Sequence, residues 1–235
     1  MVPGLVEFRS FENRDAASAA AAALLADLLG KDLASGPKKQ VSLVVSGGST
    51  PGPCFKILSQ QDLDWSRVTV IPSDERWVPL DDPDSNEFLI RSRLLQGPAM
   101  KGNVLSFFRT GLDAAQALPL IERDLAVLTQ PFSASLLGMG EDGHFASLFP
   151  DFAGLKKALD PNWGAACTMV KTAASPHLRI SLTLSALLNS AYTVLLIFGE
   201  TKRCVFESAS LGGSAYPIEA LLNLSHKPVM VIWAP

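Results

Sequence analysis

Short, almost continuously apolar segments alternate with helical segments along this chain, and this alternation restricts the possible folds more than any other feature. Residues 41–45 (VSLVV) and 192–198 (YTVLLIF) have the composition of strands that are covered on both faces. Strands that are separated by helices pair in parallel, with the helices packed on both sides of the sheet. The sequence therefore predicts an α/β fold of three layers, with a Rossmann-like, mostly parallel central sheet and helices on both faces.

The apolar periodicity and the turn residues place the individual elements. Strands are predicted at residues 41–45, 68–71, 134–137, 178–184, 192–198 and 229–233. Helices are predicted at residues 12–29, 51–58, 87–95, 113–128, 201–208 and 218–222, with a short one before residue 192. Gly30 is expected to end the first helix, and Ser49 or Thr50 to cap the second, with Pro51 in its first turn. No repeat or Pro/Gly-rich linker divides the chain, so residues 1–235 are expected to form a single domain.

The composition and the charge exclude several classes of protein. With 48% hydrophobic and 18% charged residues, the chain can bury a full core. Its 20 basic and 23 acidic residues are too evenly balanced for a nucleic-acid binder, which needs a clustered basic surface. The chain has no run of eighteen apolar residues, so no membrane span is predicted. The Ala-rich residues 16–26 are interpreted as a closely packed helix rather than as part of a signal peptide. Three widely spaced cysteines favour a reduced, cytoplasmic protein without disulfides.

Polar segments follow the predicted strands, at the points where each strand ends. In an open parallel sheet, ligands bind at the carboxyl ends of the strands, where the loops lead into helices. Four such segments are SGGSTP (46–51), SDER (73–76), GMGEDGH (138–144) and GETK (199–202). We therefore expect these four loops to form one site at a single edge of the sheet.

The SGGSTP loop is the candidate anion site. Gly47 and Gly48 allow the backbone to approach an anion closely, and the hydroxyls of Ser49 and Thr50 can donate to phosphate oxygens. A tight turn with an ordinary hydroxyl cap explains the same residues without a ligand. The loop lacks the terminal Lys-Ser/Thr of a Walker loop and the third glycine of a dinucleotide fingerprint.

Two cations are expected near this loop. Arg179 opens a predicted strand and Lys202 follows another, so both can reach a phosphate at the same edge, unless they are simply solvated. Asp74 and Arg76 lie in a predicted loop, where they orient the hydroxyls of a substrate or hold a catalytic group, unless they form only a weak surface ion pair. At the end of that loop, Ser85 and Asn86 either recognise the hydroxyls of a substrate or cap the next helix, and the residues alone favour the cap.

The GMGEDGH segment carries the candidate general base. His144 ends a segment with three glycines, and imidazole has the pKa, about 6.5, that suits proton transfer near neutral pH. A neighbouring carboxylate, Asp142 or Glu141, can hold its ring; the alternative is a structural histidine at a helix start. His177 and His226 are isolated from it, so no metal site is predicted. No activated nucleophile is recognisable, which favours activation of water over covalent catalysis.

These motifs, in this order, resemble the 6-phosphogluconolactonase family of the glucosamine-6-phosphate isomerase/deaminase superfamily. The matching segments are SGGSTP (46–51), DERWVP (74–79), SN (85–86), GMGEDGHFASLFPD (138–151), RISLTL (179–184) and GETK (199–202). Phe145 stands where the family usually has Thr, and Ser73 where it commonly has Gly. Neither departure removes a residue to which chemistry is assigned.

The resemblance implies hydrolysis of 6-phospho-D-glucono-1,5-lactone in the pentose phosphate pathway, without a cofactor. It implies that His144 is the general base and that Asp74 and Arg76 line the lactone side of the pocket. It also implies that Arg179 and Lys202 hold the phosphate together with the SGGSTP loop. The expected partner is the sugar-phosphate lactone alone, and the chain is expected to be a monomer or a weak homodimer.

Two other functions are compatible with parts of this pattern. An amino-sugar-phosphate deaminase/isomerase of the same superfamily typically has Asn-Glu-Pro after the DGH stretch and Tyr after Asp-Glu. This chain has SLFP (147–150) and Arg76 at those places, which favours the lactonase. A non-catalytic sugar-phosphate sensor is usually joined to a DNA-binding segment, and nothing before residue 41 resembles one.

Overall fold

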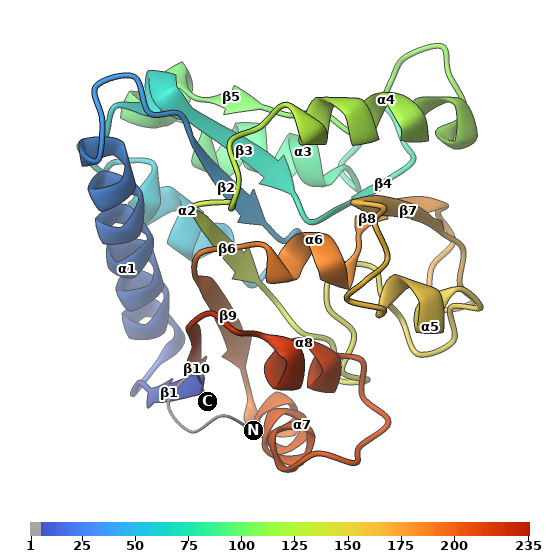
Figure 1. The fold of residues 1–235 in the computed structure, drawn as a ribbon. Helices are drawn as coiled ribbons and strands as arrows, with labels where there is room; N and C mark the ends of the chain where they lie inside the picture. The colour runs from blue at the N-terminus through green and yellow to red at the C-terminus, as the bar shows by residue number, and fades with distance from the viewer. Residues whose placement is uncertain (1–5) are drawn as a thin grey trace.

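A seven-stranded parallel sheet forms the centre of the molecule (Figure 1). The structure, a computed structural model, describes residues 6–235. The strand order is β1-β10-β9-β6-β2-β3-β5, and every neighbouring pair is parallel. The strands are β1 (Val6–Ser10), β2 (Val41–Val45), β3 (Val68–Pro72), β5 (Asn103–Val104), β6 (Ala134–Leu137), β9 (Thr193–Phe198) and β10 (Val229–Ala234). The predicted α/β fold class is confirmed.

Helices cover both faces of this sheet and make two separate hydrophobic cores. The longer helices are α1 (Arg14–Ala34), α2 (Gly52–Leu58), α4 (Ala114–Ala126), α7 (Glu200–Leu211) and α8 (Ile218–Leu224). One core joins α1 and α2 to the sheet through Leu25 and Phe55, and the other joins α4 and α7 to the opposite face through Ile121 and Phe206. Within β2, Leu43 and its neighbours alternate between the two cores, as the pleat of a strand requires.

The strand order creates a switch point between β2 and β6. From β2 the chain proceeds outward to β3 and β5, whereas from β6 it proceeds the other way to β9 and β10. The loops that leave β2 and β6 therefore diverge and open a crevice beyond the carboxyl ends of these strands. The SGGSTP loop follows β2, and the GMGEDGH loop follows β6. Two of the four predicted site loops thus border this crevice.

A second, three-stranded sheet corrects part of the sequence prediction. It has the order β4-β8-β7 and is antiparallel, with β4 (Asp74–Arg76), β7 (Cys167–Val170) and β8 (Arg179–Leu182). Residues 178–184 were expected in the parallel sheet, and the DER segment in a loop, and both expectations are wrong. Short strands with little apolar content are stabilised by pairing with distant segments, which periodicity along the chain does not reveal.

Other boundaries differ in smaller ways. The first helix continues through Gly30 to Ala34, because Leu33 beyond the glycine is still part of the buried core. The second helix begins after Pro51, which occupies the cap position without a side-chain hydrogen bond, so the predicted Ser49 or Thr50 cap is wrong. The segment predicted as one helix at residues 87–95 is α3 (Asn86–Leu89) followed by the π-helical turn η2 (Ile90–Leu94). The remaining short elements are η1 (Trp65–Arg67), η3 (Gly97–Lys101), α5 (Leu155–Ala158) and α6 (Leu184–Leu188).

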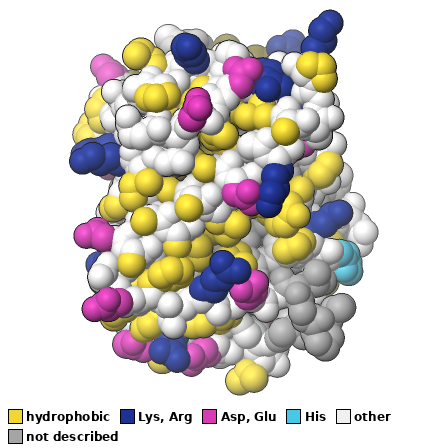
Figure 2. All heavy atoms as spheres, turned by 90° about the vertical axis from the view of Figure 1, so that its left-hand side faces the viewer, with side chains coloured by type: hydrophobic (Ala, Val, Ile, Leu, Met, Phe, Trp, Pro, Cys, Tyr) yellow, Lys and Arg dark blue, Asp and Glu magenta, His cyan; other side chains and the backbone are white. Residues whose placement is uncertain are grey.

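The outer surface on the α1 side is mixed in character. Figure 2 shows that Lys and Arg side chains are interspersed there with Asp and Glu rather than gathered in one area. Small apolar residues such as Ala19 and Ala23 of α1 are exposed. Over residues 6–235, none of the helices combines the length and the apolar character that crossing a membrane requires.

Candidate active site

A cavity of about 260 Å³ lies at the crevice between β2 and β6. All four predicted segments contribute to it, the second of them as strand β4, together with Arg179 of β8. The lining residues are Ser46, Gly47, Gly48, Ser49, Thr50, Asp74, Arg76, Asn86, Gly138, Met139, Gly140, His144, Phe145, Ala146, Arg179 and Lys202. Nine of the ten residues predicted for the site are among them; the tenth, Asp142, contacts His144 from outside the lining.

His144 lies on one wall of the cavity, with its ring orientation set by two neighbours. Its Nδ1 lies 2.6 Å from Oδ1 of Asp142, and the same oxygen accepts a hydrogen bond from the His144 backbone N–H. The ring of Phe149 packs against the imidazole with 4.1 Å between the centroids. An aspartate at Nδ1 favours the tautomer that leaves Nε2 free to accept a proton. The imidazole is therefore oriented as a base, with its side chain 28% exposed.

The glycines of this loop have a packing function. A side chain at Gly140 would overlap the His144 ring, since its Cβ would lie 2.3 Å from Nδ1. Gly143 has a φ of +75°, and its Cβ would lie 2.6 Å from Cβ of Tyr216, which packs on the loop from the segment between α7 and α8. The Ile218 N–H also donates to the Gly143 carbonyl. The loop that carries the imidazole is thus fixed by its own turn and by contacts with Tyr216 and Ile218.

Replacing Gly143 by Ala is expected to destabilise this loop. A side chain with positive φ and an overlap with Tyr216 together cost about 2–4 kcal/mol of unfolding free energy. Urea denaturation measures this loss, and kcat should fall with it because the imidazole moves. Gly164→Ala is the matched control, since nothing lies within 4 Å of its added Cβ. Equal stability and activity of the two variants would contradict this account of the loop.

A buried network joins the small sheet to the segment that follows His144. The Asp74 side chain is 6% exposed; its Oδ2 accepts hydrogen bonds from Ser147 Oγ at 2.5 Å and from Arg179 Nη1 at 3.2 Å. Ser73 Oγ donates to the other oxygen, Oδ1, at 3.1 Å. Arg179 also lies over the ring of Phe149, at 5.3 Å from its centroid. This wall therefore presents a carboxylate with a compensating guanidinium rather than a free cation.

The DER segment is a buried strand and not the surface ion pair that was its alternative explanation. Glu75 is completely buried, and burial raises the pKa of its carboxyl to about 7. Arg76 donates from Nη1 to the Asp84 carbonyl, and its Nε makes no hydrogen bond within residues 6–235. Arg76 lines the cavity, but this Nε has almost no accessible surface, so it is an unsatisfied buried donor rather than a contact for a ligand.

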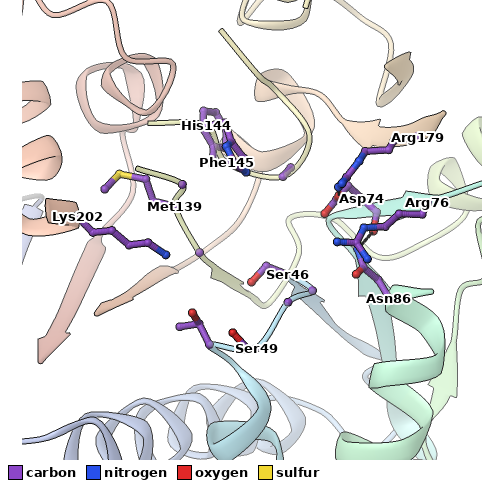
Figure 3. A pocket seen from close by; sticks show the side chains of 16 residues that line it. Ser46, Ser49, Asp74, Arg76, Asn86, Met139, His144, Phe145, Arg179 and Lys202 are labelled. Carbon is purple, nitrogen blue, oxygen red and sulfur yellow. Dashed lines mark hydrogen bonds and ion pairs between the residues drawn. The ribbon is translucent and has the colours of Figure 1, made fainter. Parts of the chain in front are cut away.

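Lys202 approaches from the start of α7, on the opposite side of the cavity from Arg179 and Arg76 (Figure 3). It is half-buried, and burial lowers its pKa while the charge of Glu141 opposes the change. Among the described residues it makes no ion pair within 4 Å. The SGGSTP loop lies between the two groups of cations in the same view. An anion at this loop could therefore be contacted from both sides.

Sequence reasoning left the role of Asn86 undecided and missed that of Ser147. Ser85 and Asn86 were expected either to recognise hydroxyls or to cap a helix; Ser85 is the cap, and Asn86 lines the cavity. Ser147, which donates to Asp74, was noted only as part of SLFP. For Asn86, the indications were its place at the end of the loop that follows DER and the match of SN (85–86) to the family. The family departures are both accommodated: Phe145 is a buried core residue and Ser73 binds Asp74.

Fold and site together define the class: an α/β enzyme with its cavity at the switch point of a parallel sheet. The family model for glucosamine-6-phosphate isomerases/6-phosphogluconolactonase matches residues 12–233, and the chain belongs to this family. A 6-phosphogluconolactonase from Rhizobium meliloti is 36% identical, covering 96% of this chain and 97% of the relative. A 6-phosphogluconolactonase from Pseudomonas aeruginosa is also 36% identical, covering 83% of this chain and 82% of the relative. The expected family membership is confirmed.

Solved structures support the same grouping. The crystal structure of a 6-phosphogluconolactonase from Shewanella baltica superposes with a TM-score of 0.92 at 37% identity, over 100% of both chains. A monomeric glucosamine-6-phosphate deaminase superposes with a TM-score of 0.75 at 19% identity, which shows a shared fold alone. The relatives with substantial identity are thus lactone hydrolases, as the sequence predicted.

Proposed function

We propose that this chain hydrolyses 6-phospho-D-glucono-1,5-lactone to 6-phospho-D-gluconate, with His144 as the general base. The observation that carries the proposal is one cavity in which an aspartate-oriented imidazole faces a glycine-rich loop and two groups of cations. The relatives named 6-phosphogluconolactonase support the choice of substrate. The product enters the pentose phosphate pathway, and we place the reaction in the cytoplasm.

The chemistry needs one proton to move twice. His144 Nε2 takes a proton from water as the water oxygen bonds to C1 of the lactone, which gives a tetrahedral oxyanion. The guanidinium of Arg76, which lines the cavity, or a backbone amide of the glycine loops stabilises this negative charge. When the C1–O5 bond breaks, the imidazolium returns the proton to O5. The products are a carboxyl group, which ionises, and a free hydroxyl.

The phosphate does not take part in bond changes and serves to orient the ring. Gly47, Gly48, Ser49 and Thr50 contribute backbone and hydroxyl donors, and Arg179 and Lys202 supply positive charge, in our proposal. Fixing the phosphate restricts the lactone to orientations in which C1 is close to the activated water. Asp74 and Arg76 then contact the ring hydroxyls.

A direct assay distinguishes this function from its alternatives. Freshly generated lactone opens spontaneously, so the measured quantity is the acceleration by the protein over buffer, coupled to oxidation of the 6-phosphogluconate formed. Glucosamine 6-phosphate is offered in parallel, and ammonia is measured. Ammonia release without lactone hydrolysis would assign a deaminase, and phosphate-ligand binding without turnover of either substrate would assign a sensor.

A further inference from the structure

Glu75 is buried beneath the cavity wall, and its carboxylate is fully engaged by one short segment of the chain. Its Oε1 accepts hydrogen bonds from the backbone N–H of Arg76 at 2.8 Å and of Asn86 at 2.7 Å. Its Oε2 accepts from the Glu87 N–H at 2.7 Å and from Ser85 Oγ at 3.1 Å. Three of the four donors belong to residues 85–87, at the beginning of α3. The side chain therefore ties α3 to β4 across the loop of residues 77–84.

This tie determines where Asn86 lies. With its backbone held by Glu75, Asn86 donates from Nδ2 to the Asp74 carbonyl at 2.7 Å. Its other amide atom, Oδ1, fills the space beside Gly47, where an added Cβ would lie only 1.8 Å away. Asn86 thus lies between the strand that carries Asp74 and the loop assigned to phosphate, and Figure 3 shows it near Asp74 and Arg76. Its position sets the separation of these two walls.

We propose that Glu75 is a positioning residue for lactone hydrolysis, acting through Asn86 to hold the Asp74–Arg76 wall at the correct distance from the Gly47 loop. The inference rests on the proposed function. Glu75 is not among the residues that line the cavity, so it acts only through others. Burying an ionisable carboxyl opposes folding unless it is hydrogen-bonded, and all of the compensating donors here serve the geometry of the site. Burial raises the pKa of Glu75, and the N–H donors of Asn86, Glu87 and Arg76 lower it.

The first test is Glu75→Gln, which keeps the volume but turns an NH₂ group toward donors that need an acceptor. We expect kcat/KM to fall about tenfold because reactive groups are displaced by a fraction of an ångström. The control is Glu122→Gln, because Glu122 also accepts two backbone N–H bonds, from Ala166 at 3.0 Å and Cys167 at 2.8 Å, outside the cavity. Both variants should lose stability. When activity is measured under conditions in which both variants are fully folded, only Glu75→Gln should lose more than about twofold.

Binding separates a failure of this inference from a failure of the proposed function. Isothermal titration with 6-phosphogluconate should give a dissociation constant several-fold higher for Glu75→Gln than for Glu122→Gln. If the wild type neither accelerates lactone opening nor binds 6-phosphogluconate, the proposed function fails. If the wild type is active and the two variants have equal kcat/KM and equal affinity, only the positioning role is refuted.

A second test does not depend on the folding of Glu75→Gln. Gly47→Ala forces a methyl group into Asn86, so it should lower kcat/KM in the wild-type background. In the Asn86→Ala background that obstruction is gone. The fall in kcat/KM caused by Gly47→Ala should therefore be several-fold smaller there, because substitutions of two residues in contact do not have additive effects. Equal losses in both backgrounds would overturn the contact between Asn86 and Gly47 on which the inference depends.

Discussion

Replacing His144 by Ala is expected to lower kcat by about 10²–10⁴-fold, the range typical for loss of a general base. The imidazole lines the cavity, and Asp142 at 2.6 Å from Nδ1 orients it. No other histidine is among the cavity-lining residues. The affinity for 6-phosphogluconate should change little, because the phosphate contacts assigned to other residues remain. Steady-state kinetics with freshly generated lactone, corrected for spontaneous opening, measure the effect.

Two further variants test whether the loss of activity is specific to His144 and how much depends on its orientation by Asp142. His226→Ala removes an exposed histidine that is absent from the cavity lining, and it should leave kcat within about twofold of the wild-type value. Asp142→Asn should lower kcat less than His144→Ala, because the base remains but its ring loses the carboxylate that sets the tautomer. Lactone hydrolysis by His144→Ala near the wild-type rate would rule out the role we assign to the imidazole.

Replacing Lys202 by Ala is expected to raise KM by about 10- to 100-fold, with a smaller change in kcat. A hydrogen bond to a charged group contributes about 1.5–3 kcal/mol, and each 1.4 kcal/mol is a factor of ten in affinity. Of the two residues assigned to the phosphate, Lys202 gives the result that is easier to interpret, because it makes no ion pair in the described part of the chain that its removal would break. Its half-buried position reduces competition from water and salt.

Arg179 needs a more conservative replacement, since Arg179→Ala would also leave the buried Asp74 with fewer partners. Arg179→Lys keeps the charge and loses the fork of donors, so it should raise KM less than Lys202→Ala does. Arg203→Ala is the control for Lys202, because Arg203 lies beside it on α7 and pairs with Glu207 instead of lining the cavity. Unchanged KM in both Lys202→Ala and Arg179→Lys would refute the phosphate assignment.

Much of the architecture could be predicted because it depends on local patterns. The apolar segments at residues 41–45 and 134–137 are strands with the predicted boundaries, since a parallel strand covered on both faces must be apolar throughout. The loops after them could be assigned to a site because the carboxyl ends of parallel strands meet at one edge. Helix ends were predicted less well: Gly30 does not end α1, because burial of Leu33 outweighs the cost of a glycine within a helix.

The amino-acid sequence by itself determined the fold class, the loops of the site and the histidine within them, because each follows from residue types at short spacing. Only the tertiary structure decided that the DER segment is a buried strand, that Arg179 pairs with Asp74, and that Asn86 separates two walls of the cavity. Those contacts join residues that are 39 to 107 positions apart along the chain. Their existence depends on how two sheets pack together, and no local pattern along the chain encodes that packing.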